Sequence, residues 1–517
     1  MTVQQLVDGF NQAATNCDPA EMLHMANELL KRDPNNADYL ALKLQALDSA
    51  GRLTEDLGLI QKYILAKSTN VAAFILLYKA YIKRGKIYEA LISLTFALSV
   101  DPENTVCQKL QEALLAEINP KYTHVRINIM TMTRIGHLCT EIEPWARARQ
   151  EQEMGCLYLF ISSTTEYKTA NSYVYNLLTQ VAHIVDCAFF YSLYLSRPLL
   201  LSENAFAEFP YDIHTALRGV PDMDIQRQGT INLNKIYRNH PPCLTIPETE
   251  KKQGWDYLNR FGIRANDKIV CLHVRDSAYL DRTFPSRDWS YHDYRDADIT
   301  SYEESIEYLI KKGYKIVRLG NETNQELQII SNSYIDLCIN RDPFYGDFIE
   351  LFLLSECAFF IGNFGGLYGV APLFDTPIII INGAPVQEPY SKYSNFIPKL
   401  LFKNNEIVSL VDICNGKKLS DEGSQPIKYS TGKDLAAHGY HYENNSPKDI
   451  LRAVSEFEKR VQKDHFDVEP KSLQLAFRDA VANEFCNVES TNLICNSFLE
   501  DHPQAFPELV ITMDNLP

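Results

Sequence analysis

The first 120 residues repeat themselves with a period of 34 positions, and this period constrains the fold more than any other feature of the chain. Gly51 and Gly85 are 34 positions apart, and Pro34 and Pro102 are separated by twice that spacing. Both prolines follow an aspartate. A repeat of this length predicts pairs of antiparallel helices, each pair stacking on the next.

The period is that of the tetratricopeptide repeat, and the copy that begins at Val71 fits it best. Ala90 and Ala97 are small enough to let two helices approach closely, and Gly85 falls at the turn between them. Pro102 ends the second helix because proline cannot continue one. We therefore predict a tetratricopeptide-like helical module over residues 1–120.

The module contains two weaker copies, near Val3 and Ala37, and residues 105–118 are expected to form a closing helix. Its role stays open at this stage. Solenoids bind partner proteins on their concave face, and they also pack on a neighbouring domain or form a homodimer. A protein partner, the acceptor of a reaction and a homodimer are therefore all compatible with these repeats.

Bulk composition indicates a folded protein of several domains. The 517 residues are 45% hydrophobic and 22% charged, and 50 Lys and Arg against 66 Asp and Glu give a net charge of −16. Without a basic stripe, an acidic chain of this kind argues against nucleic-acid binding. Twelve scattered cysteines without a CxxC motif suit a reducing compartment. We expect a cytoplasmic protein, since no secretory signal is visible. The longest uncharged apolar stretch contains Pro372 and four glycines, so we expect no membrane span.

Residues 256–415 alternate apolar strands with amphipathic helices, which predicts a doubly wound parallel sheet. The strands are expected at 268–275, 314–319, 334–339, 358–361 and 377–381. The helices are expected at 301–312, 324–331, 347–356 and 366–374. Ligands of such folds bind at the carboxyl ends of the strands.

Three of these strand ends carry groups that bind anions. The first ends in His273 and Arg275, which share a face because side chains alternate along a strand. A guanidinium suits a diphosphate, and glycines let backbone N–H groups approach a phosphate at a helix N-terminus. The glycine spacing from Gly362 to Gly369 is neither the dinucleotide fingerprint nor a P-loop. The predicted donor-binding residues are His273, Arg275, Arg318, Asn363, Phe364, Gly365 and Gly366.

Several runs resemble a family of bacterial glycosyltransferases associated with surface-carbohydrate gene clusters. These runs are Cys271–Asp276, Tyr294–Ile299, Gly313–Gly320, Glu443–Pro447 and Asn496–Glu500, and the resemblance spans from about Thr131 to the end of the chain. The His-x-Arg strand end is also similar to fucosyltransferase-like GT-B enzymes, whose equivalent arginine holds the donor's diphosphate. Asp296 is a departure, since the family usually has asparagine there.

The resemblance implies a glycosyltransferase that uses a nucleotide-diphosphate sugar, with a weak hint of GDP. It implies two Rossmann-like domains (GT-B), with an acceptor-side domain at 121–255, a nucleotide-sugar domain at 256–415 and a partly helical C-terminal extension at 416–517. Strands are expected at 125–130 and 157–161 of the first domain. A long helix is expected at 175–196, with His183 and Asp186 as satisfied polar groups.

A base for an inverting transfer has three candidates, His137, Asp276 and Asp298. His137 lies on the expected acceptor side, and histidine is the side chain that most often serves as a general base. Asp298 completes a DxD with Asp296, but it also precedes a helix, whose N-terminus favours a carboxylate. We expect no metal at this motif or at the histidines near 440. Donor, acceptor (glycan or protein) and stereochemistry stay open. The alternative is a non-catalytic helical-repeat scaffold with a degenerate nucleotide-sugar-binding domain.

Overall fold

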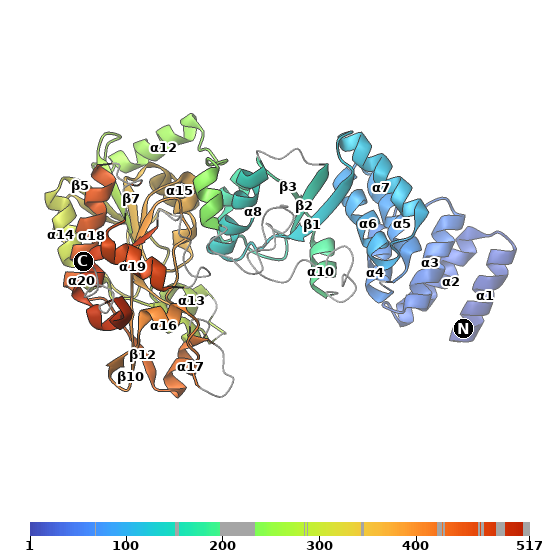
Figure 1. Cartoon of the computed structure of the whole chain (residues 1–517). Coiled ribbons are helices and arrows are strands. Elements are labelled where there is room, and N and C mark those ends of the chain that lie inside the picture. Colours follow the sequence, from blue (N-terminus) through green and yellow to red (C-terminus); the bar gives the residue numbers. More distant parts are fainter. Residues whose placement is uncertain are drawn as a thin grey trace. The chain divides into compact units, whose positions relative to one another are not determined.

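The computed structural model describes residues 1–67, 69–149, 155–196, 233–283, 285–286, 288–342, 346–420, 426–427, 430–463, 466, 470–481 and 492–509 (Figure 1). The chain divides into two compact units. Unit 1 comprises Met1–Thr131, Glu151–Lys168 and Ala182–Thr215, and unit 2 comprises Met132–Gln150, Thr169–Val181 and Ala216–Pro517.

Unit 1 begins with the predicted helical repeats. The helices are α1 (Val3–Thr15), α2 (Pro19–Arg32), α3 (Ala37–Ser49), α4 (Leu57–Ala66), α5 (Val71–Ile82), α6 (Ile87–Val100) and α7 (Thr105–Ile118). Gly51 and Gly85, the glycines that revealed the period, adopt φ of 67° and 68°. This left-handed conformation strains any residue with a Cβ atom, which explains why glycine recurs at the turn. The expected helix pairs and closing helix are confirmed.

The repeats share a hydrophobic core with a three-stranded parallel sheet in the same unit. The sheet has the order β1 (His124–Ile129), β2 (Cys156–Ser162) and β3 (His183–Asp186), and α10 (Ala188–Ser196) follows it. The ring of Phe190 lies 5.7 Å from that of Phe96 and 5.8 Å from that of Tyr81. The last repeats therefore pack on the sheet and form one hydrophobic core with it.

The predicted long helix at 175–196 is wrong. The segment forms α9 (Ser172–Leu178), strand β3 and helix α10 instead. A short apolar run such as Ile184-Val185 is equally compatible with a buried strand, and β-branched side chains favour the strand. His183 and Asp186 do have partners, as expected. The Tyr88 hydroxyl lies 3.2 Å from His183 Nδ1, and Asp186 Oδ1 accepts from the Thr164 N–H at 2.8 Å.

Unit 2 is built on a seven-stranded parallel sheet with the order β13-β9-β8-β7-β4-β5-β6. The strands are β4 (Lys268–His273), β5 (Tyr314–Arg318), β6 (Tyr334–Asp336), β7 (Phe359–Gly362), β8 (Ile378–Gly383), β9 (Ser394–Pro398) and β13 (Leu493–Ile494). The larger helices are α8 (Ile135–Arg149), α12 (Glu248–Asn259), α14 (Glu303–Lys311), α15 (Gly346–Glu356) and α18 (Pro447–Gln462). The order, with its crossovers, confirms an α/β fold after the helical repeats.

Shorter elements complete unit 2. Three strands form a small antiparallel sheet, β11 (Glu406–Ile407), β10 (Leu400–Lys403) and β12 (Tyr440–Glu443). The short helices are α13 (Ala278–Thr283), η2 (Ser290–Arg295), η3 (Ile299–Tyr302), η4 (Leu367–Gly369), η5 (Ala371–Phe374), α16 (Leu410–Cys414), α17 (Gly432–Ala437), α19 (Ser472–Ala480), α20 (Asn496–Asp501) and η7 (Pro503–Ala505).

Two helix predictions in unit 2 are wrong. Residues 324–331 form no helix, and 366–374 form the two 3₁₀ turns η4 and η5 rather than one α-helix. Pro372 lacks the N–H that an α-helix would use, and Gly369 favours a turn over a helix interior. Among the described residues, none of the helices is long and apolar enough to cross a membrane.

The two late motifs of the family resemblance hold the C-terminal extension on the sheet. Asn445 and Asn382, the second-last residue of β8, each accept a hydrogen bond from the other's backbone N–H, at 2.7 and 2.6 Å. The Glu456 carboxylate on α18 accepts from the N–H groups of Asn496 and Ser497, both at 2.9 Å, at the start of α20. The residues that carry the likeness in this region therefore have structural roles.

Candidate functional site

The candidate site lies at the carboxyl edge of the large sheet, where β4 and β7 end side by side. The Asn363 side chain, directly after β7, joins two segments there. Its Oδ1 accepts from the Arg275 N–H at 3.0 Å, and its Nδ2 donates to the Arg295 carbonyl at 3.1 Å. Asn363 is fully buried. Its amide is occupied by backbone groups, so it positions the two arginines.

Arg275 is a mostly buried cation whose guanidinium forms an ion pair with Asp296. The segment that carries Asp296 is joined to the residues after β4, since the Ala297 N–H donates to the Arg275 carbonyl at 3.0 Å. Burial lowers the pKa of Arg275 to about 10, and the neighbouring positive charge of Arg295 adds to this effect. An anion bound nearby would stabilise the charged form of this buried guanidinium.

Arg295 is a second cation of this site, and the sequence reasoning did not single it out. Its guanidinium lies 5.6 Å from the centre of the Tyr294 ring, and within the described residues no carboxylate forms an ion pair with it. Asp296 therefore serves Arg275 while Arg295 lacks an acidic partner in that part of the chain. The arginine stands inside the Tyr294–Ile299 run of the family resemblance, which was the signal available to find it.

Lys399 is a third cation that the sequence reasoning missed. It directly follows β9 and is 3% exposed. Its Nζ donates to the carbonyls of Tyr294 at 2.9 Å and Asp296 at 2.6 Å. Burial lowers its pKa to about 8, and the positive charge of Arg275 contributes. A lysine immediately after an apolar strand was the only sequence signal, and many surface lysines share it.

His273, the last residue of β4, is held in one tautomer. Its Nδ1 lies 3.0 Å from the Leu319 carbonyl, which can only accept, so Nδ1 carries the proton. Burial lowers the pKa of His273 below its ordinary value. The ring is therefore neutral near pH 7, and Nε2 is an acceptor. Such a nitrogen suits a hydroxyl or N–H group of a ligand better than a phosphate oxygen.

Gly365 and Gly366 leave backbone open at the end of β7. A Cβ atom on Gly365 would lie 3.6 Å from His273 Nε2 and 3.7 Å from Arg275 Cδ. Within the described chain, the N–H groups of Gly365 and Gly366 donate no hydrogen bond. Phe364 is buried against Tyr368, with ring centres 5.6 Å apart. Gly365 thus brings the backbone next to His273 and Arg275, while the buried Phe364 ring holds the loop in place.

Arg318, the third predicted anion ligand, is 2% exposed and already paired. Its Nη1 lies 3.0 Å from Asp336 Oδ2 and donates to the Gln325 carbonyl at 2.8 Å, and its Nη2 donates to Thr323 Oγ1 at 2.7 Å. These bonds fix the loop after β5. Arg318 therefore holds the loop after β5 in place and is not available to bind a ligand through these groups.

Two of the three base candidates have structural partners. Asp276 accepts from the Ala278 N–H at 3.0 Å, and its second oxygen accepts from the Asn324 N–H at 2.8 Å. Asp298 is exposed and caps η3 by accepting from the Thr300 N–H at 2.9 Å. Both carboxylates hold turns, which leaves His137 as the candidate with an accessible nitrogen.

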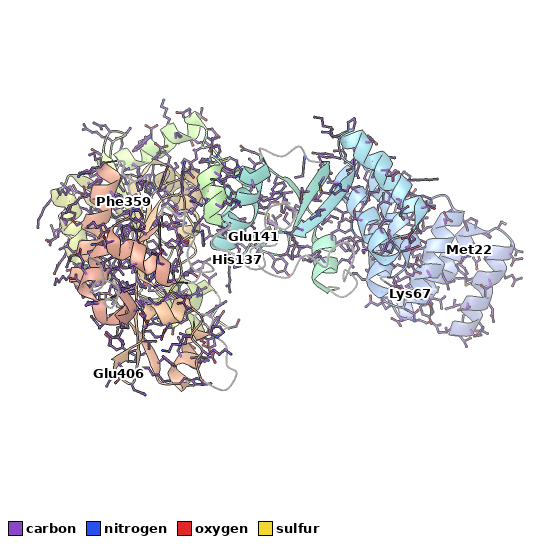
Figure 2. All side chains as sticks on the ribbon, in the orientation of Figure 1. Met22, Lys67, His137, Glu141, Phe359 and Glu406 are labelled. Atoms are coloured by element: carbon purple, nitrogen blue, oxygen red, sulfur yellow. The ribbon has the colours of Figure 1, made fainter. Side chains whose placement is uncertain are left out.

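His137 stands on the first turn of α8, one turn before Glu141 (Figure 2). Its Nδ1 lies 3.4 Å from Glu141 Oε1, and its side chain is 32% exposed. The preceding residue, Gly136, touches the glycine loop, because a Cβ atom on Gly136 would lie 3.6 Å from Gly366 Cα. The structure thus puts a half-buried histidine, beside a carboxylate, directly after a glycine whose backbone lies close to Gly366.

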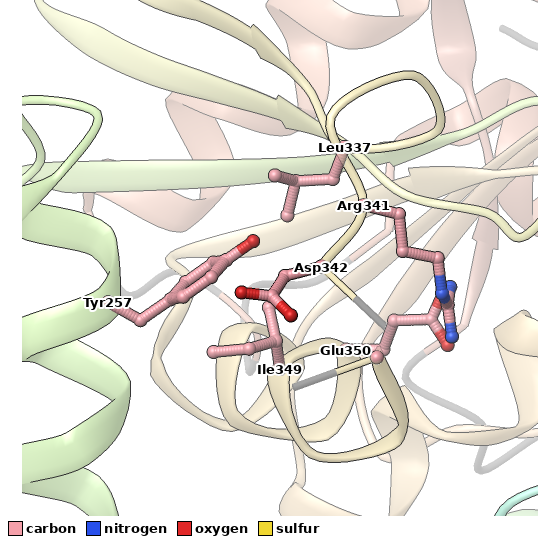
Figure 3. A pocket seen from close by; sticks show the side chains of 7 residues that line it. Tyr257, Leu337, Arg341, Asp342, Ile349 and Glu350 are labelled. Carbon is pink, nitrogen blue, oxygen red and sulfur yellow. The ribbon is translucent and has the colours of Figure 1, made fainter. Parts of the chain in front are cut away.

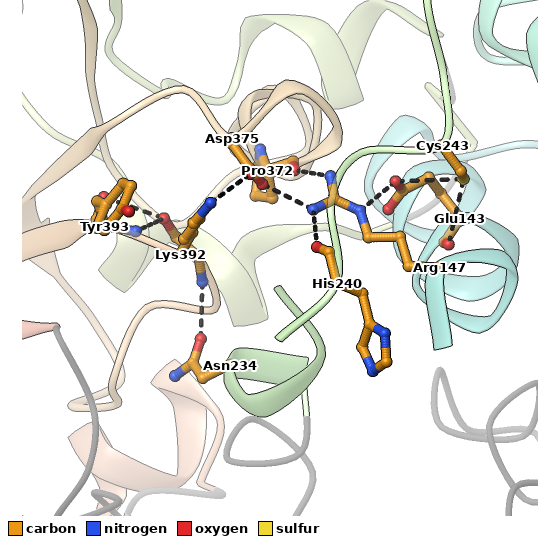
Figure 4. Close-up of polar contacts among 10 residues, drawn as sticks. Glu143, Arg147, Asn234, His240, Cys243, Pro372, Asp375, Lys392 and Tyr393 are labelled. Atoms are coloured by element: carbon orange, nitrogen blue, oxygen red, sulfur yellow. Dashed lines mark hydrogen bonds and ion pairs between the residues drawn. The ribbon is translucent and has the colours of Figure 1, made fainter. Parts of the chain in front are cut away.

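A buried charge network fixes α8 within unit 2 (Figure 4). Arg147 forms ion pairs with Glu143 and with Asp375, the latter at 2.7 Å, and donates to the Pro372 carbonyl at 2.6 Å. Lys392 pairs with the other oxygen of Asp375 at 3.0 Å. Burial raises the pKa of Glu143 to about 7 against the attraction of Arg147. The network anchors the helix that carries His137.

A small cavity near the end of β6 is not large enough for a substrate. It is lined by Tyr257, Leu337, Arg341, Asp342, Gly346, Ile349 and Glu350 (Figure 3). Its volume of 10 Å³ is close to the space that one water molecule needs. Arg341 and Glu350 fill one wall with an ion pair at 2.8 Å. Among the described residues, no group of His, Cys, Asp and Glu side chains is arranged to hold a metal ion.

No family model and no curated protein matches this sequence. Among solved structures, the MamA protein is 18% identical and covers 23% of this chain and 65% of its own, with a TM-score of 0.22. ADP-heptose LPS heptosyltransferase II of E. coli is 12% identical and covers 66% of this chain and 99% of its own, with a TM-score of 0.34. An O-GlcNAc transferase of Thermobaculum terrenum is 11% identical and covers 74% and 82%, with a TM-score of 0.22. These overlaps are partial.

Proposed function

We propose that the chain is a glycosyltransferase that moves a sugar from a nucleotide-diphosphate donor to a glycan or protein acceptor. The observation that carries this proposal is the pair of neighbouring arginines, Arg275 and Arg295, at the carboxyl edge of the sheet. Arg275 stands beside Gly365, and within the described residues the Gly365 and Gly366 N–H groups donate no hydrogen bond, while Asp296 forms an ion pair with Arg275 and none with Arg295. A diphosphate matches this set in charge and in hydrogen-bond acceptors.

In this reaction the site must stabilise the leaving group, which is the nucleoside diphosphate. As the bond between the sugar C1 and the diphosphate oxygen breaks, the electron pair stays on the diphosphate. Preorganised donors such as the Arg275 guanidinium and the Gly365 amide stabilise that charge, and they need no rearrangement to do so. Arg318 and Asn363 support these donors through their own contacts.

The acceptor hydroxyl forms the new bond to C1 and loses its proton. We assign that proton to His137 in an inverting reaction, with Glu141 orienting the ring. His273 Nε2 is proposed to accept from a donor hydroxyl or N–H group. No metal ion takes part in this scheme. The helical repeats are proposed to present a protein or glycan acceptor, or a protein partner.

The test is a screen of ligands and of activity. Nucleoside diphosphates ADP, CDP, GDP, TDP and UDP are compared in thermal-shift measurements, because a ligand of the folded state raises its melting temperature. The corresponding nucleotide sugars are then tested for slow release of nucleoside diphosphate, with and without EDTA. We expect one base to give both a shift and EDTA-resistant release. If none binds and none is hydrolysed, the chain is a scaffold and the proposal is wrong.

A further inference from the structure

Lys399 is a buried lysine whose ammonium group binds backbone carbonyls. It lies between β9 and β10, and its own backbone N–H donates to the Gly383 carbonyl at the end of β8, at 3.1 Å. A buried ammonium ordinarily has a carboxylate partner, because desolvation of an unpaired charge is costly. In the described part of the chain, no carboxylate forms an ion pair with Lys399, and its partners are two backbone carbonyls.

Those two carbonyls belong to the segment that carries the site's other charges. Tyr294, Arg295 and Asp296 are consecutive, and each carbonyl accepts from a buried side chain. Lys399 binds the first and the third, and Asn363 binds the second. The segment is therefore held by its backbone, which leaves the Arg295 side chain and the Asp296 carboxylate to serve the site.

We propose that Lys399 is a positioning residue of the diphosphate site, which holds the Tyr294–Asp296 segment and contributes the positive charge that an anionic donor compensates. The inference rests on the proposed function. Lys399 acts on the donor through Asp296 and Arg275 and through Arg295. An anion bound beside Arg275 relieves the repulsion between the cations, so the protonated form of Lys399 and the bound donor stabilise each other.

Because donor binding is coupled to the protonated form of Lys399, the affinity for the donor should depend on pH. The titratable and charged groups around it are Arg275 at the end of β4, Tyr294, Arg295 and Asp296 on the segment it holds, and Tyr442 of β12, whose ring stacks on Tyr294 at 5.6 Å. With a pKa of about 8, Lys399 is charged at pH 7 and largely neutral at pH 9. Donor affinity is therefore expected to fall over this range.

The experiment compares Lys399→Met and Lys399→Arg with the wild type and with Lys403→Met, a matched control on β10 whose Nζ contacts the Tyr440 hydroxyl at 3.2 Å. Affinity for the five nucleoside diphosphates is measured by calorimetry at pH 7 and pH 9. We expect at least tenfold weaker binding by Lys399→Met and unchanged binding by Lys403→Met. Wild-type affinity should fall several-fold from pH 7 to pH 9, and Lys399→Arg, which stays charged, should bind without that fall.

The outcomes separate this inference from the proposed function. If the wild type binds a nucleotide and Lys399→Met binds it within twofold, the role of Lys399 is wrong while the function stands. The same holds if Lys399→Arg keeps the wild-type pH dependence, a result that does not require Lys399→Met to fold. If the wild type binds none of the five nucleotides, both proposals are wrong.

Discussion

Asn363 Oδ1 accepts a hydrogen bond from the backbone N–H of Arg275 at 3.0 Å, across the boundary between β7 and β4. The other end of the same amide binds the carbonyl of Arg295. One buried side chain therefore sets the positions of two cations whose sequence positions differ by twenty. The relationship explains how strand ends become a site, since the residue after β7 orients the residues after β4.

Replacing Arg275 by alanine is expected to abolish tight nucleotide binding. The guanidinium supplies charge-assisted hydrogen bonds to the proposed diphosphate, and their loss should weaken binding by about 10- to 100-fold. Calorimetry with the nucleotide selected by the screen measures this. Arg282→Ala is the control, because Arg282 lies on the nearby α13 but pairs with Glu322 on the surface. Equal losses in both variants would remove Arg275 from the site.

Replacing Gly365 by alanine is expected to separate binding from folding. The added methyl would meet His273 and Arg275 at 3.6 and 3.7 Å, which are ordinary contact distances, so stability should change by no more than about 0.5 kcal/mol. It would nevertheless occupy the space beside the Gly365 amide, and nucleotide affinity should fall about tenfold. Gly58→Ala in the repeats is the control. Unchanged affinity would place the phosphate elsewhere.

The fold was largely predictable because its signals are local. The positive φ of Gly51 and Gly85 makes glycine recur with the repeat, and the apolar runs of β4, β5, β7 and β8 are bounded by turn residues. The segment 175–196 was misread, since its apolar residues fit a buried strand as well as a helix. Propensity alone does not decide such a run, and packing in the core of unit 1 does.

The candidate site was predictable only in part. Arg275 and the glycines stand where any parallel sheet presents ligand-binding groups. Arg318 shares that position, but its partner Asp336 lies on β6, and no local pattern reveals that pairing. The sequence did not predict a role for Lys399 for the same reason, because the carbonyls that it binds lie about a hundred residues earlier in the chain. Partners distant in sequence decide which strand-end residues remain available to a ligand.

Replacing Asn445, whose amide pairs with that of Asn382, is expected to lower the stability of the protein without directly changing the candidate site. Asn445→Ala would leave the buried Asn382 N–H and the Pro398 carbonyl without their partners, now at 2.7 and 2.8 Å. Unsatisfied buried groups of this kind cost about 2–4 kcal/mol together. Urea unfolding followed by tryptophan fluorescence is suitable, since all three tryptophans belong to unit 2. The exposed neighbour Asn444→Ala should change stability by less than about 0.5 kcal/mol, and an equal loss there would contradict the assignment.

Glu143 is expected to make the stability of unit 2 fall as the pH rises toward neutrality. Its pKa is raised from 4.5 to about 7 by burial, so the folded state retains a proton that the unfolded chain has released. Unfolding then releases this proton, and higher pH favours unfolding between about pH 4.5 and 7. The stabilisation is fully present below pH 4.5 and is lost by about pH 7.

The variant Glu143→Gln isolates this effect, because its amide still offers an oxygen to Arg147 but does not titrate. The difference in unfolding free energy between wild type and variant should decline by up to about 1.4 kcal/mol per pH unit from pH 5 to pH 7 and then level off. Urea unfolding by tryptophan fluorescence at pH 5, 6, 7 and 8 measures it. Glu248→Gln, with a side chain that is 89% exposed, should give a difference from wild type that stays flat. A flat difference for Glu143→Gln as well would mean that Arg147 keeps the carboxylate ionised throughout, and that the anchor of α8 is a permanent ion pair.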